Sequence, residues 1–285
     1  MSEKNVVVVT GASRGIGKGV ALAFGATGAT VYVSGRTLKG SGTPLPGSIE
    51  ETAEAVSAAG GRGIAVQCDH ANDEDVRRLF VRVEEESGRL DVLVNNACSL
   101  PAALSAEGGF WERSLELADM FDVGLRSTYV ASYYGAPLMV RQRRGLIANI
   151  SFYGAVSYFH GPAYGAQKAG GDKMMYDMAV DLAPHNVAAV SIWSGRVRTE
   201  MNKLRWQGKD GAEERLAQYE TPEFTGLVLV ALQKDPALMT LSGQSIIAAE
   251  YASEHGIRDL DGKQPASHRD TLGAPPFRPL FPSDS

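Results

Sequence analysis

Three side chains in this sequence have the types and the spacing for proton chemistry at a carbonyl group. Tyr164 and Lys168 lie four residues apart in a segment that predicts a helix, and Ser151 ends an apolar run upstream of them. Positions i and i+4 share one helix face, so the phenol is expected beside the ammonium. A nearby positive charge lowers the pKa of a phenol from its ordinary value of about 10. These three residues are the candidate catalytic group, and an ordinary surface pair on a helix is the alternative.

A glycine-rich turn near the amino end predicts a dinucleotide site. Residues 10–17 read Thr-Gly-Ala-Ser-Arg-Gly-Ile-Gly, between a β-branched run and a predicted helix. Glycines let the backbone approach a pyrophosphate, and the amino end of a helix attracts its negative charge. A plain tight turn is the alternative, but placement between a strand and a helix favours a nucleotide. The candidate cofactor-binding residues in this turn are Gly11, Ser13, Arg14, Gly15, Ile16 and Gly17.

The residue after the second predicted strand indicates which dinucleotide binds. An acidic side chain there would hold the ribose 2′-hydroxyl of NAD, but the sequence has Arg36. Arg14 and Arg36 could grip a 2′-phosphate, so NADP(H) is favoured over NAD(H), with two solvent-facing arginines as the alternative. Asp69, after the third strand, is expected to bind the adenine amino group. Asn95 and Ala97, after the fourth, are expected beneath the ribose.

The elements that must position these residues alternate between short strands and longer helices. Strands are expected at residues 6–10, 30–34, 63–67, 91–95, 146–150, 187–193 and 245–248. Helices are expected up to about residue 27 and over 49–59, 73–86, 112–142 and 162–183. This order predicts an α/β fold with a single Rossmann-like domain, whose doubly wound, mostly parallel seven-stranded sheet is flanked by helices. We expect that domain over residues 1–262, with a polar flap at 196–221, and a Pro-rich tail over 263–285.

Composition argues against several classes of function. The net charge of −5 opposes a broad nucleic-acid surface. No apolar run approaches the ~18 residues that a membrane span needs. The two cysteines, Cys68 and Cys98, form neither a disulfide framework nor a metal-binding spacing, so no metal site is expected. A reducing, cytoplasmic location is the simplest expectation.

These motifs, in this order, make residues 5–250 resemble the short-chain dehydrogenase/reductase superfamily. The resemblance implies hydride transfer between a nicotinamide cofactor and a small-molecule carbonyl or alcohol. It implies that Tyr164 is the acid/base, that Lys168 is its electrostatic partner and a ribose ligand, and that Ser151 donates to the carbonyl. It also implies a homodimer or homotetramer. The segment expected to contact the nicotinamide amide and the phosphates carries Gly195, Val197 and Thr199.

Segments 123–126, 134–136, 241–243 and 256–262 resemble one subgroup of that superfamily, which implies NADPH-dependent reduction of steroid-like or foreign ketones. The alternative is an NADP(H)-binding sensor or scaffold with little turnover. Three departures bear on that choice. Gly124 stands where the superfamily usually has Asn, Cys98 where it has Gly, and Ser194 where it has Pro. We expect the proton relay to survive through the main-chain carbonyl of Gly124 and water.

Overall fold

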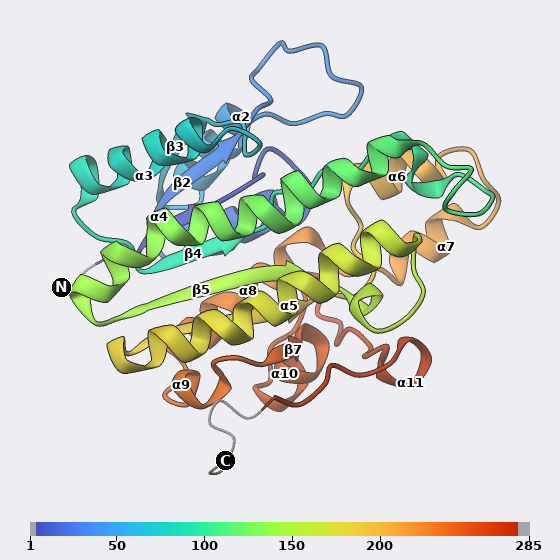
Figure 1. Ribbon diagram of the computed structural model, residues 1–285. Coiled ribbons are helices and arrows are strands. Elements are labelled where there is room, and N and C mark those ends of the chain that lie inside the picture. The colour runs from blue at the N-terminus through green and yellow to red at the C-terminus, as the bar shows by residue number, and fades with distance from the viewer. Residues whose placement is uncertain (1–3, 279–285) are drawn as a thin grey trace.

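The computed structural model describes residues 4–278 and confirms the α/β class (Figure 1). One parallel sheet has the strand order β3-β2-β1-β4-β5-β6-β7. The strands are β1 (Val6–Val9), β2 (Thr30–Gly35), β3 (Arg62–Gln67), β4 (Val92–Asn95), β5 (Gly145–Ser151), β6 (Val187–Trp193) and β7 (Ser245–Ile247). The order reverses between β1 and β4, the point at which open α/β sheets bind ligands.

Helices cover both faces of the sheet, so β1, β4 and β6 are buried throughout. One face carries α1 (Gly15–Ala26), α2 (Ile49–Ala58), α8 (Pro222–Lys234) and α10 (Ala248–Glu254). The other face carries α3 (Asp73–Ser87), α4 (Ser127–Gln142) and α5 (Pro162–Leu182), of which α4 and α5 lie across the front in Figure 1. Successive β1 side chains enter the two layers alternately, because side chains alternate along a strand.

The single long helix expected over residues 112–142 is wrong. A 3₁₀ turn, η2 (Leu115–Ala118), precedes a kinked π-helical segment, η3 (Phe121–Arg126), and regular helix begins only with α4. Gly124 has φ 145° and ψ −45°, and Val123 is also non-helical. A positive φ of this kind is open to glycine and costly for other residues. The glycine therefore interrupts the helix about three turns after its expected start.

Short elements complete the loops that connect the strands and the long helices. They are η1 (Ala102–Ser105), η4 (Tyr153–Ala155), η5 (Ala183–His185), α6 (Glu200–Trp206), α7 (Ala212–Ala217), α9 (Leu238–Leu241) and α11 (Arg269–Leu272). The polar segment 196–221 thus contains two short helices, and neither α6 nor α7 has a buried residue. From here on, the flap means residues 199–219, the part of the expected 196–221 segment that contains both helices.

The chain beyond residue 262 lies against the rest of the structure as far as it is described. The His268 N–H donates to the Tyr153 hydroxyl at 3.0 Å, and Arg269 pairs with Glu250. Residues 279–285 of the expected tail lie outside the described residues. Within residues 4–278, no helix has the length and apolarity to cross a membrane.

Candidate active site

The glycine-rich turn packs too tightly for side chains at two positions. A Cβ on Gly11, whose φ is +63°, would lie 2.7 Å from the Ala97 Cα, and one on Gly17 would lie 2.6 Å from the Gly11 carbonyl oxygen. Asn96 ties this loop to the end of β4, since its Nδ2 donates to the carbonyls of Thr10 and Gly11, each at 2.9 Å. The loop is thereby fixed at the reversal point of the sheet.

The first turn of α1 already holds a negatively charged oxygen. The Gly15 N–H donates to the Glu200 Oε2 at 2.8 Å, and Gly15 has φ +58°. Helix amino ends favour anions because their N–H groups lack partners within the helix. The carboxylate stands where a phosphate oxygen would bind, so the loop fits the dinucleotide. Of the other loop residues, Ser13 is buried and Ile16 packs against the core.

The two arginines expected at a 2′-phosphate differ in their contacts. The Arg14 guanidinium donates to the carbonyls of Leu45, Pro46 and Gly47 in the loop after β2, at 2.9–3.3 Å. Arg36 is exposed at the end of β2, and its charge helps to lower the pKa of His70, although burial contributes more. Arg14 therefore braces a loop, and Arg36 is the cation left at the strand end.

The adenine and ribose candidates differ in where their side chains point. The half-buried Asp69 accepts from the Ala71 N–H at 3.0 Å just after β3. Asn95 is buried and donates to Ser132 of α4 at 3.0 Å, which aims its amide into the helix layer. Ala97 donates its N–H to the Thr10 hydroxyl at 3.0 Å, directly beside the phosphate loop. Asn96, whose amide holds that loop, belongs with this group.

Ser151, Tyr164 and Lys168 come together at the carboxyl end of β5. The Lys168 Nζ donates to the carbonyl of Ile150, the neighbour of Ser151, at 3.0 Å, and lies 5.6 Å from the centroid of the Tyr164 ring. Gly154 lets that ring approach, because a Cβ there would lie 2.6 Å from the Tyr164 Cε1. All three catalytic candidates are buried, so the surface-pair alternative fails.

The ionisation of Tyr164 differs from the expectation. Burial raises the pKa of the phenol above its ordinary value, and Cys98 raises it further. This shift is opposite to the lowering expected from Lys168, because desolvation disfavours the phenolate. Tyr164 is therefore a protonated phenol over the neutral range.

Burial also raises the pKa of the Cys98 thiol, with Lys168 opposing the shift. Since the thiolate is the nucleophilic form, Cys98 is a packing residue of the site.

A buried carboxyl that sequence reasoning missed stands one turn beyond Lys168. Asp172 accepts from the indole N–H of Trp193 at 2.9 Å and has 2% of its surface exposed. Burial raises its pKa, while Ser151, Ser191 and Trp193 oppose the rise. Its i+4 spacing from Lys168 was the available signal.

A second missed carboxyl holds the segment expected at the nicotinamide. Both oxygens of the buried Glu220 lie 3.0 Å from the Gly195 nitrogen, and Glu220 forms a β-bridge with Val197. Thr199 caps α6 by accepting from the Asn202 N–H at 3.3 Å. Sequence carried no signal here, because Glu220 and Gly195 meet only in the fold.

Glu220→Gln is expected to flatten the pH dependence of stability. Burial raises the pKa of Glu220 from 4.5 to about 8. Between these values only the unfolded carboxyl ionises, so the folded state loses stability as pH rises from 4.5 to 8. Thermal melting should show the variant above wild type at pH 8 by a few degrees, at about 2–4 °C per kcal/mol. Parallel melting curves against pH would contradict the assignment.

Gly124 has a structural replacement for the missing side chain. A Cβ on Gly124 would lie 3.1 Å from the Cγ of Gln167, which fills that space. The Gly124 carbonyl accepts from the Gln167 Nε2 at 3.0 Å and from the Thr128 hydroxyl at 2.9 Å. A carbonyl oxygen has two lone pairs, and both have protein donors. The structure therefore does not support the expected relay through this carbonyl and water.

The described residues offer no metal site of the usual kind: residues 4–278 contain no group of three or more His, Cys, Asp or Glu placed around a common point.

This sheet, phosphate loop and buried Ser-Tyr-Lys group define an oxidoreductase class, and the chain belongs to the short chain dehydrogenase family, which it matches over residues 5–210. It is similar to "Dehydrogenase/reductase SDR family member 1" of Mus musculus, with 39% identity over 270 residues that cover 90% of this chain and 84% of that protein. The protein of the same name from Homo sapiens is 40% identical, with the same coverage. The crystal structure of a candidate dehydrogenase from Xanthomonas campestris superposes with TM-score 0.77 and 27% identity, covering 90% of this chain and 92% of that one. The family implies NAD(P) binding.

Proposed function

We propose that the chain is a carbonyl reductase that uses NADP(H) to reduce a hydrophobic ketone, steroid-like or foreign to the cell. The observation that carries this proposal is the buried Ser151, Tyr164 and Lys168 group at the end of β5. A protonated phenol beside a fixed ammonium is the arrangement that gives a proton to a carbonyl oxygen as it gains negative charge.

Each side chain has a distinct part in that reaction. When bound, the nicotinamide supplies the hydride. Ser151 donates a hydrogen bond to the substrate oxygen, Tyr164 gives it a proton, and Lys168 stabilises the phenolate that remains. The phosphate loop, with Gly11, Gly15 and Gly17, and the segment holding Gly195, Val197 and Thr199 would hold the cofactor. Asp69, Asn95 and Ala97 would lie along its adenosine half.

Apolar side chains around Tyr164 support a hydrophobic substrate. The Tyr164 ring clusters with Leu104, Phe152 and Trp193, and Phe159 packs against it. Apolar walls with a few convergent polar groups are typical of small-molecule sites. A screen of ketones and aldehydes with NADPH and with NADH tests turnover and substrate class together, and absence of turnover across it would refute the proposal.

Arg36→Ala is expected to weaken NADPH binding about 10–100-fold and NADH binding little, since a charge-assisted contact to the 2′-phosphate is lost. Binding titrations of both cofactors measure this. Lys39→Ala removes an exposed charge from the adjoining loop and is the matched control. Equal losses for NADPH and NADH would overturn the NADP(H) preference.

The proposal includes a homodimer or homotetramer in a cytoplasmic setting. Tyr129 and Tyr133 are exposed on α4, and their rings stack with centroids 6.5 Å apart. The helices α4 and α5 run side by side across the front of Figure 1. Light scattering at micromolar concentration tests the assembly. Both cysteines are unpaired thiols, which supports a reducing compartment.

A sensor or scaffold that binds NADP(H) with little turnover is the second candidate. The occupied carbonyl of Gly124 favours it, because a proton supply to Lys168 would need another route. Sustained NADPH oxidation with any ketone of the screen separates the two functions.

A further inference from the structure

The contact between Glu200 and Gly15 joins two segments far apart in the sequence. Glu200 is the first residue of α6 in the flap, and Gly15 is the first residue of α1 in the phosphate loop. The carboxylate oxygen lies 2.8 Å from the Gly15 nitrogen. The Thr199 methyl would lie 3.4 Å from a Cβ on Gly15, so the flap rests directly on this turn. The Gly15 N–H therefore donates to the Glu200 carboxylate at the place where family members bind a pyrophosphate.

The flap has few other attachments. Neither of its helices contributes a buried residue, so no apolar core holds it down. Beyond Glu200, its side-chain hydrogen bonds to the rest of the chain are few. The Asn202 amide donates to the Val197 carbonyl at 2.7 Å, Arg205 donates to Ser105 at 2.6 Å, and the Lys263 ammonium donates to the Ala217 carbonyl at 3.1 Å. Segments with few buried contacts open at low free-energy cost. The Glu200 contact is thus a large part of what holds this segment on the loop.

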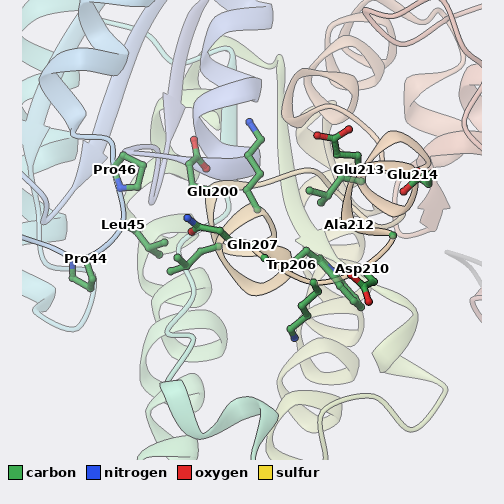
Figure 2. Close-up of a pocket in the computed structure, with 16 residues that line it drawn as sticks. Pro44, Leu45, Pro46, Glu200, Trp206, Gln207, Asp210, Ala212, Glu213 and Glu214 are labelled. Carbon is green, nitrogen blue, oxygen red and sulfur yellow. The ribbon is translucent and has the colours of Figure 1, made fainter.

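A cavity of about 840 Å³ opens between the flap and the loop after β2. Figure 2 shows Pro44, Leu45 and Pro46 on one side, with Trp206 and Asp210 of the flap across from them. Glu200 lines the same cavity, so the cavity extends to the amino end of α1. A ligand entering here meets a carboxylate already bound to the donor that its phosphate needs.

We propose that Glu200 is an internal competitor of the cofactor, a latch that holds the flap on the phosphate loop until a dinucleotide pyrophosphate displaces it. Two anions cannot share the Gly15 N–H, because like charges in contact repel. Cofactor binding and release of the flap are therefore one coupled event. The inference rests on NAD(P) binding alone and is independent of the substrate or the preference for NADP(H).

The apparent cofactor affinity is the intrinsic affinity multiplied by the fraction of molecules in which the latch is open. A charge-assisted hydrogen bond of ordinary strength leaves about one molecule in ten open. Glu200→Gln and Glu200→Ala should therefore bind NADPH about tenfold more tightly than wild type, measured by calorimetric titration.

The matched control is Glu213→Gln, which removes the same charge from an exposed position on α7. General attraction between a less acidic flap and an anionic ligand would strengthen binding equally in Glu200→Gln and Glu213→Gln. The latch instead predicts a gain specific to Glu200. A gain in Glu213→Gln as large as that in Glu200→Gln, or no gain in the Glu200 variants, would overturn the latch.

Trypsin cleavage without cofactor tests the latch independently of any ligand. Lys203, Arg205 and Lys209 offer cleavage sites in the flap. Glu200→Gln should be cut there faster than wild type and Glu213→Gln, and equal cutting of all three would count against the latch. If no variant bound a dinucleotide, the cofactor assignment would fail, and the cleavage rates would still decide whether Glu200 holds the flap.

Discussion

Tyr164→Phe is expected to lose about 10²–10⁴-fold in turnover while its cofactor affinity stays near wild type, because a general acid contributes an effect of that size. The ring of the buried phenol has its centroid 5.6 Å from the Lys168 Nζ, and phenylalanine keeps the ring that packs against Phe159 and His160. Steady-state kinetics on a ketone identified by the screen, with titration of NADPH, measures both quantities.

Tyr133→Phe is the matched control, since it removes a phenol from an exposed ring on α4. The pH profile adds a second criterion. Because burial raises the pKa of Tyr164, the acid stays protonated and its contribution to reduction should not fall between neutral pH and about pH 9. Turnover retained by Tyr164→Phe would remove this residue from the mechanism.

Lys168→Ala is expected to lose at least about 10²-fold in turnover and to weaken cofactor binding as well, since its ammonium is proposed both to stabilise the phenolate and to bind the ribose. Its Nζ is buried and donates to the Ile150 carbonyl at 3.0 Å, so the charge has a fixed place. Kinetics and NADPH titration together distinguish this double loss from the single loss of Tyr164→Phe.

Packing and charge are separated by Lys168→Met, which keeps most of the side-chain volume. Lys173→Met, on the same helix, breaks an exposed ion pair with Asp177 and a cation–π contact with Tyr176, both away from the catalytic group, and should behave as wild type. If Lys168→Met kept wild-type turnover, the ammonium would have no electrostatic part in the reaction.

The positions of the strands along the chain were predictable because they depend on patterns between near neighbours. Apolar β-branched runs separated by helical stretches predicted the strands of the sheet, and the fold confirms the class. The helix over 112–142 was wrong because one glycine between apolar residues carries little weight in a periodic pattern. Gly124 has a φ of 145°, and the buried Gln167 of α5 packs against it, so the break depends on tertiary packing.

The candidate catalytic group was visible for the same local reason. A spacing of four residues places Tyr164 and Lys168 on one helix face, and Ser151 ends an apolar run. The sequence shows which side chains are charged, but it does not show which groups those side chains contact. Arg14 was assigned to a 2′-phosphate, and the fold gives it to the carbonyls of 45–47.

The sequence by itself determined the sheet class, the phosphate loop and the Ser151, Tyr164 and Lys168 group, because each follows from spacing within one or two elements. Only the tertiary structure decided that burial raises the pKa of Tyr164, that Glu220 holds Gly195, and that Glu200 sits on Gly15. These depend on desolvation and on contacts across 25 to 185 positions of the chain, which no local pattern encodes.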